Sequence, residues 1–90
     1  MYDYEDLKNE EKNDNLEEFY INEMVGTIRS YRIHRGISQR ELSRISGVTQ
    51  NIISRMENGT RIPQFQTLVK LIDALDLELT LNIIPKGDNE

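Results

Sequence analysis

Amide and guanidinium side chains are concentrated in one short stretch, residues 36–59, which reads "GISQRELSRISGVTQNIISRMENG". Gln and Asn each present a hydrogen-bond donor beside an acceptor, and Arg presents a planar fork of donors. In the major groove of DNA, such amides match adenine and such a fork matches guanine. Such side chains could therefore form paired hydrogen bonds with planar partners, provided that the fold presents them together.

The other reactive side chains in the sequence are sparse. The chain has no Cys and one His, His34, so a disulfide framework, a thiolate zinc site and a His cluster are excluded. The scattered carboxylates offer no pairing of a nucleophile with a base. We therefore expect the protein not to be an enzyme and to bind no metal or cofactor.

Two short helices joined at Gly47 would position the polar groups of residues 36–59. Ser38 followed by Glu41 forms a capping box, and Thr49 is suited to cap the second helix. Such a pair joined by a tight turn is the helix-turn-helix arrangement. The residues expected on its inner face are Leu42, Ile45, Ile53 and Met56.

Flanking segments should supply the core of the domain. Apolar residues recur at helical spacing from Asn15, which with Glu18 resembles a capping pair, to Gly36. A further helix should follow Pro63, with an apolar stripe of Phe65, Leu68, Val69, Leu71, Ile72 and Leu75. The period then changes to two, which predicts a strand with Leu77, Leu79, Leu81 and Ile83 on one face.

Charge divides the chain into three parts. Residues 1–23 carry nine acids against two lysines, residues 24–62 carry seven arginines against two acids, and residues 63–90 carry five acids against two lysines. A basic middle between acidic ends is typical of a protein with two partners of opposite charge. The alternative is a solvated surface whose charge is merely uneven.

Four regions are expected from these patterns. Residues 1–14 have too few apolar side chains to offset the entropy of ordering, and we interpret them as an acidic flexible arm. The helical domain spans 15–76, a C-terminal strand 77–85 and a frayed tail 86–90. No stretch approaches the roughly 18 apolar residues that span a membrane, so we expect a soluble, cytoplasmic protein with no membrane partner.

The residues "RGISQRELSRISGVTQNIISRMENG", followed by "RIPQFQTLVKLIDAL", resemble the Xre family, the helix-turn-helix family of the lambda and 434 Cro and repressor proteins. The resemblance covers a little over half of the chain. It implies an all-α, lambda-repressor-like helix-turn-helix domain of four to five helices, to which the pattern adds one short C-terminal β-strand. The departures are Ser43, where the family often has Ala, and the strand, where a fifth helix is common.

The family places the second helix of the pair in the major groove and so implies roles for particular residues. Those implied to contact bases are Thr49, Gln50, Asn51, Ser54 and Arg55. Those implied to hold the DNA backbone are Ser38, Gln39, Arg40, Asn58, Thr60 and Arg61. The alternative is that these polar side chains are only the solvent face of a small helical domain.

The resemblance also implies a structural ion pair. Arg32, late in the first long helix, matches the family position that commonly pairs with the Glu of the "E-N-G" end of the recognition helix, here Glu57. We expect this pair to support the fold rather than to contact DNA.

The predicted strand would need a partner, because an isolated strand leaves backbone groups unpaired and an apolar face exposed. Pairing with the same strand of a second chain would form a homodimer and place two recognition helices about 34 Å apart, one DNA turn. Pairing with the N-terminal arm or with another protein is the alternative.

The acidic arm, the C-terminal "LDLELTLNIIP" pattern and the helix-turn-helix together resemble HigA-type antitoxins of type II toxin-antitoxin modules. The resemblance implies an antitoxin that represses its own operon by binding palindromic double-stranded operator DNA and neutralises a small basic RelE-like (HigB-type) ribonuclease. The expected toxin-binding residues are Tyr2, Tyr4, Leu7, Leu16, Phe19 and Tyr20. The alternatives are a solubilising arm and a stand-alone Xre-family repressor without a toxin.

Overall fold

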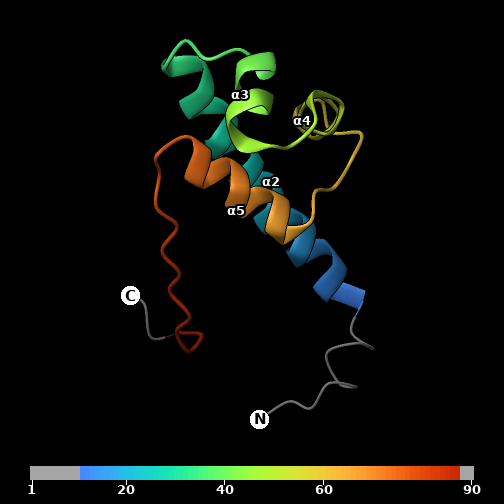
Figure 1. Cartoon of the computed structure of the whole chain (residues 1–90). Helices are drawn as coiled ribbons and strands as arrows, with labels where there is room; N and C mark the ends of the chain where they lie inside the picture. The colour runs from blue at the N-terminus through green and yellow to red at the C-terminus, as the bar shows by residue number, and fades with distance from the viewer. Residues whose placement is uncertain (1–10, 88–90) are drawn as a thin grey trace.

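The computed structural model describes residues 11–87, and four helices form this part of the chain (Figure 1). In chain order they are α2 (Glu11–His34), α3 (Gln39–Ser46), α4 (Gln50–Glu57) and α5 (Phe65–Ala74). The long helix α2 and helix α5 lie side by side, and α3 and α4 cover one end of them. The predicted all-α helix-turn-helix fold is confirmed.

Helix α2 begins about one turn before the start expected at Asn15. Residues 11–14, which were expected to belong to the flexible arm, are therefore helical. The acids of this stretch favour an earlier start, because negative charge near a helix N-terminus is stabilised by the helix dipole. The capping pair expected at Asn15 consequently lies inside the helix.

Local sequence signals set the ends of α3 and α4. The Ser38 hydroxyl accepts a hydrogen bond from the Glu41 N–H at 3.0 Å, and the Thr49 hydroxyl accepts one from the Ile52 N–H at 3.3 Å. Between the helices, Gly47 has φ +79°, a left-handed conformation that glycine adopts without steric cost. These caps fix the turn of the helix-turn-helix.

A single buried cluster joins all four helices. Its members are Val25 and Ile28 of α2, Leu42 of α3, Ile53 and Met56 of α4, Leu68, Leu71 and Ile72 of α5, and the flanking Val48 and Leu75. Three residues expected on inner faces are instead exposed: Ile45, Phe65 and Val69. Helix α3 has eight residues and contributes only Leu42 to this cluster. Ile45 therefore lies outside the cluster.

The strand expected over residues 77–85 is absent from the described chain, and this prediction is corrected. Asp76 turns the chain with φ +57°, the Leu77 N–H donates to the Ile72 carbonyl at 3.0 Å, and an irregular segment follows (Figure 1). A strand requires a neighbouring strand to complete its hydrogen bonds. No other segment of the described chain supplies one, so the residues remain unpaired. We call residues 77–85 the C-terminal segment.

None of the described helices combines the length and the apolar character needed to cross a membrane.

Candidate nucleic-acid interface

The outer face of α4 carries the side chains expected to contact bases. Gln50, Asn51 and Arg55 are exposed, whereas Ile53 and Met56 on the opposite face are buried. Thr49 is exposed at the helix start, where its hydroxyl serves as the cap, and Ser54 is half-buried. The structure therefore brings two amides and one guanidinium together on one exposed helix face.

Of the side chains expected to hold a phosphate backbone, some are exposed and others form hydrogen bonds within the protein. Arg40 and Arg61 are exposed, whereas the Ser38 hydroxyl is occupied as the cap of α3. The amide of Gln39 donates a hydrogen bond to Glu57 at 3.0 Å, an interaction that the sequence did not predict. Gln39 is half-buried, and its hydrogen bond joins the start of α3 to the end of α4.

The loop after α4 is fastened to the end of that helix. The Asn58 side-chain oxygen accepts hydrogen bonds from the Thr60 N–H at 3.1 Å and the Thr60 hydroxyl at 2.7 Å. The backbone N–H groups of Thr60 and Arg61 both donate to the Arg55 carbonyl, at 2.9 and 3.2 Å. Asn58 and Thr60 therefore shape the loop, and Arg61 is presented beside α4.

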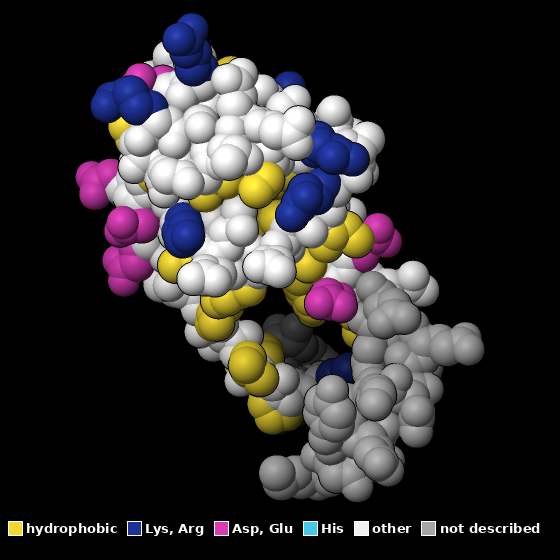
Figure 2. All heavy atoms as spheres, turned by 45° about the vertical axis from the view of Figure 1, so that its right-hand side comes forward, with side chains coloured by type: hydrophobic (Ala, Val, Ile, Leu, Met, Phe, Trp, Pro, Cys, Tyr) yellow, Lys and Arg dark blue, Asp and Glu magenta, His cyan; other side chains and the backbone are white. Residues whose placement is uncertain are grey.

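The surface around α3 and α4 is rich in positive charge. Figure 2 shows several Lys and Arg side chains over the upper part of the molecule, where Figure 1 places these two helices. Acidic side chains lie mainly along the sides and below. Such a surface suits a nucleic acid, because the positive charges can contact phosphates while the exposed amides contact base edges.

Behind this face, Arg32 and Glu57 form a bidentate ion pair. The Arg32 Nε and Nη2 atoms donate to the two carboxylate oxygens of Glu57 at 2.8 Å each. The third nitrogen, Nη1, donates to the Ile37 carbonyl at 2.7 Å. The side chains are 11% and 3% exposed, so the structure brings together a nearly buried pair between α2 and the last residue of α4.

Two further groups approach Glu57 that sequence reasoning missed. One is the Gln39 amide, and the other is the Arg29 Nε atom, 3.6 Å from Glu57 Oε1. The approach of Arg29 could have been found from the sequence, because Arg29 and Arg32 are three residues apart and therefore lie on one helix face. We call Arg29, Arg32, Gln39 and Glu57 the Glu57 network.

The Glu57 network favours the ionised form of the Glu57 carboxylate. Burial alone would raise the pKa of Glu57, but hydrogen bonds from Arg32 and Gln39 and the charges of Arg32 and Arg29 outweigh burial and lower that pKa below its ordinary value. The hydrogen bond to Glu57 raises the pKa of Arg32. The cations also offset the unfavourable placement of an acid at the C-terminal end of α4.

A separate apolar surface lies on the N-terminal half of α2. Leu16, Phe19 and Tyr20 are exposed, and the rings of Phe19 and Tyr20 meet edge to face with centroids 5.4 Å apart. Glu17 and Glu18 are exposed between them. The other expected toxin-binding residues, Tyr2, Tyr4 and Leu7, lie outside the described residues. Three large apolar side chains beside acids form a surface suited to a protein partner.

Comparisons with known proteins agree with this geometry. A family model described as Helix-turn-helix matches residues 28–82. The chain is 41% identical over 71 residues to an uncharacterized HTH-type transcriptional regulator of Haemophilus influenzae, covering 79% of this chain and 66% of that protein. It is 48% identical over 54 residues to one of Sinorhizobium fredii, covering 60% of this chain and 28% of that protein. The chain thus spans less than two thirds of the length of either curated relative.

A solved structure is similar over almost the whole chain. It is a chain of a structure titled "Toxin-Antitoxin module from Streptococcus pneumoniae", with a TM-score of 0.62 and 31% sequence identity. The match covers 94% of each chain.

Proposed function

This chain belongs to the helix-turn-helix family, and on that premise we propose that it is a repressor that binds palindromic operator DNA as a homodimer through the outer face of α4. The observation that carries the proposal is the exposure of Gln50, Asn51 and Arg55 on the side of α4 opposite the buried Ile53 and Met56. In the major groove the amides would pair with adenine and the guanidinium with guanine.

Contacts to the phosphates would flank the recognition helix. Arg40 on α3 and Arg61 in the loop after α4 are exposed, which supports their assignment to such contacts. Because these contacts release counterions from the DNA, affinity should fall as salt rises. The net charge of −5 should keep the affinity for random DNA weak. Discrimination between operator and random DNA would then come mainly from contacts to bases.

Replacing Arg55 with Ala tests base recognition. The variant should lose about 1 to 3 kcal/mol of binding free energy on the cognate operator and accept more bases at one position. The fold should survive, because the group that fastens the following loop is the Arg55 backbone carbonyl and not its side chain. Fluorescence anisotropy with cognate and single-substituted duplexes measures the change.

Arg61→Ala is the matched control for Arg55→Ala. It removes one exposed arginine from a position expected to contact phosphate, and it should weaken binding to cognate and random DNA by the same factor. If Arg55→Ala also weakened both equally, Arg55 would contact phosphate and the assignment of base recognition to this residue would be wrong.

We further propose that the protein is an antitoxin that neutralises a small basic RelE-like (HigB-type) ribonuclease. The similarity to a chain of a toxin-antitoxin module over 94% of this chain supports the proposal, as does the apolar surface of Leu16, Phe19 and Tyr20 beside Glu17 and Glu18. A ribonuclease presents positive charge to RNA, so an acidic surface with aromatic anchors suits it. The competing function is a stand-alone repressor, which the names of the two curated relatives favour.

The double substitution Phe19→Ala and Tyr20→Ala separates these two functions. Both side chains are exposed on α2 and distant in sequence from α4, so operator binding and stability should be preserved. The proposed toxin would be encoded by the gene beside this one, as expected for a protein that represses its own operon. Rescue of growth during expression of that neighbouring gene should be lost, because aromatic anchors contribute much of the binding energy of an interface. Growth assays and operator binding are measured in parallel.

Ile33→Ala controls for loss of an exposed apolar side chain at the other end of α2. It should leave rescue unchanged. Full rescue by the double variant would show that Phe19 and Tyr20 do not form the toxin contact. A neighbouring gene whose product is not toxic would support the stand-alone repressor.

A further inference from the structure

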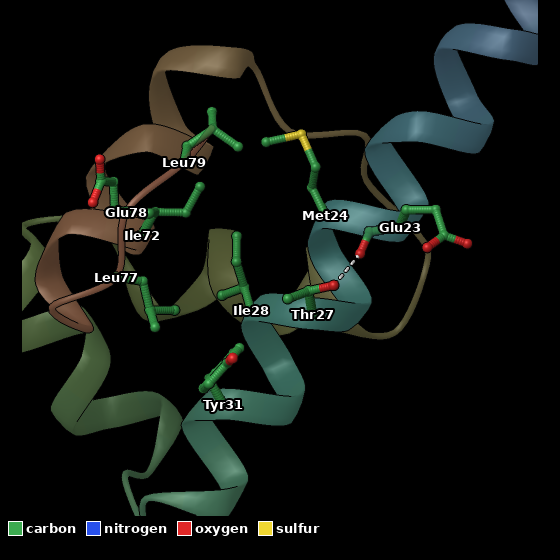
Figure 3. Close-up of a pocket in the computed structure, with 9 residues that line it drawn as sticks. All are labelled: Glu23, Met24, Thr27, Ile28, Tyr31, Ile72, Leu77, Glu78 and Leu79. Carbon is green, nitrogen blue, oxygen red and sulfur yellow. Dashed lines mark hydrogen bonds between the residues drawn. The ribbon is translucent and has the colours of Figure 1, made fainter. Parts of the chain in front are cut away.

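Arg29 lies on the side of α2 that faces the end of α4. Thr27 and Tyr31 of the same helix line a hollow between α2, α5 and the C-terminal segment (Figure 3). Successive residues of an α-helix are about 100° apart around its axis, so Arg29, two residues from each of them, projects from nearly the opposite side. On that side lies Glu57, whose Oε1 atom is 3.6 Å from the Arg29 Nε atom. Arg29 therefore belongs to the Glu57 network and not to the hollow.

The two arginines of the Glu57 network use their donors differently. All three nitrogen atoms of the Arg32 guanidinium donate hydrogen bonds within the protein, to Glu57 and to the Ile37 carbonyl, and this side chain is 11% exposed. Arg29 approaches Glu57 through Nε alone, at a distance too long for a hydrogen bond, and its side chain is 54% exposed. The Nη1 and Nη2 groups of Arg29 can therefore donate to another molecule.

Charge in the Glu57 network is unbalanced. Glu57 supplies one negative charge against the positive charges of Arg29 and Arg32, and no other acid in the described part of the chain forms an ion pair with either arginine. Arg32 is bidentate and nearly buried, so it is the partner that neutralises Glu57. The excess positive charge therefore lies on the exposed side chain of Arg29, where an anion can reach it.

The neighbours of Arg29 belong to the surface proposed to contact DNA. The Gln39 amide donates to the same Oε1 atom of Glu57, at 3.0 Å, so Arg29 lies beside the start of α3. Arg40, the next residue of α3, is exposed. The dipole of α3 also favours negative charge at its start. A phosphate beside this helix end would be within reach of both α2 and α3.

We propose that Arg29 contacts a phosphate of the DNA backbone. The inference rests on the proposed binding of DNA by α4, and it extends the interface from α3, α4 and the loop after them to α2. The Nε atom of Arg29 would stay beside Glu57, while Nη1 and Nη2 would donate to phosphate oxygen atoms. Because a phosphate contact carries no sequence information, Arg29 would strengthen the binding of operator and random DNA by the same factor.

Replacing Arg29 with Ala tests the contact through the salt dependence of binding. Each phosphate contact contributes about 0.9 to the slope of log K against log salt concentration. Arg29→Ala should therefore make the slope less steep by about 0.9 for each half-site, and should weaken binding by about tenfold for each half-site in about 0.1 M salt. Fluorescence anisotropy measures binding to a duplex from the DNA that precedes this chain's gene and to a duplex of random sequence.

Arg29→Lys and Lys70→Ala are the controls. Arg29→Lys keeps the positive charge and should retain the slope of the wild-type chain. Lys70→Ala removes one exposed positive charge from α5, outside the proposed interface, and should leave the slope unchanged. Urea denaturation is measured on each variant. Arg29→Ala should keep nearly full stability, because the approach of Arg29 to Glu57 is long and the Arg29 side chain is half exposed.

The outcomes separate this inference from the function on which it rests. A wild-type chain that binds neither duplex would overturn both. An unchanged slope in Arg29→Ala, even with weaker binding, would show that Arg29 acts only through the fold; it overturns the inference and leaves recognition by α4 intact. Equal reductions of the slope in Arg29→Ala and Lys70→Ala would reveal an effect of net charge alone and also overturn it, as would a slope that Arg29→Lys does not retain.

Discussion

Replacing Glu57 with Ala should lower the free energy of unfolding by about 3 to 5 kcal/mol, because it leaves the nearly buried Arg32 guanidinium without its anion. The same change removes the acceptor of the Gln39 amide, which joins the start of α3 to the end of α4. Urea denaturation followed by circular dichroism measures the loss. We expect a lower midpoint with an unchanged slope, since the unfolded chain exposes the same surface.

Glu41→Ala is a matched control, because Glu41 also forms a bidentate pair with an arginine. Arg44 Nε and Nη2 lie 3.1 and 2.6 Å from its two carboxylate oxygens. Those side chains are 70% and 45% exposed, so water already solvates both charges and the midpoint should barely move. Equal losses in the two variants would show that burial does not decide the strength of the Glu57 pair.

The Glu57 network should also make stability depend on pH. Burial opposes ionisation of Glu57, but its hydrogen bonds and the nearby arginines hold its pKa in the folded chain below the ordinary value of 4.5. The contribution of this group to stability is therefore complete above about pH 4.5 and is lost as pH falls through the lowered pKa. Glu57→Gln, studied from pH 3 to 7, should reduce the slope in the acidic part of that range.

The short-range features of the fold could be predicted because they depend on neighbouring residues. Ser38, Thr49 and Gly47 act as caps and turn as expected, since each satisfies a backbone group within three or four positions of itself. The resemblance to the Xre-like helix-turn-helix family, drawn from the same stretch, is confirmed by the match over residues 28–82. The pairing of Arg32 with Glu57 was implied by that resemblance.

Features that depend on the assembled helices could not be predicted in the same way. The contact of Gln39 with a phosphate stays a prediction, whereas its hydrogen bond to Glu57 at 3.0 Å depends on a proximity that the spacing of 18 residues does not reveal. Phe65 and Val69 fit an apolar stripe, yet the core is filled by Leu68, Leu71 and Ile72. The alternation from Leu77 indicates an apolar face that needs cover, but it does not indicate what covers that face.

One recognition helix such as α4 contacts only half of a palindromic site. Replacing Leu81 with Lys should give monomers whose affinity for a two-half-site operator is about 100-fold lower or weaker still, since the second half-site is no longer bound at a high effective concentration. Affinity for an isolated half-site should be unchanged. Leu81 is 72% exposed in one chain, so the helical domain itself should keep its stability. Analytical ultracentrifugation and operator binding are measured on the same samples.

Asn82→Lys serves as the control for Leu81→Lys, because it adds the same charge at the adjacent position on the other face of the segment. An added cation by itself attracts DNA, so charge alone would strengthen binding in both variants. A loss confined to Leu81→Lys must therefore come from the apolar contact between copies. If that variant remained dimeric and kept its affinity for the operator, the two recognition helices would have to be joined by a surface other than residues 77–85, and the exposed Leu81 and Ile83 would need a different partner.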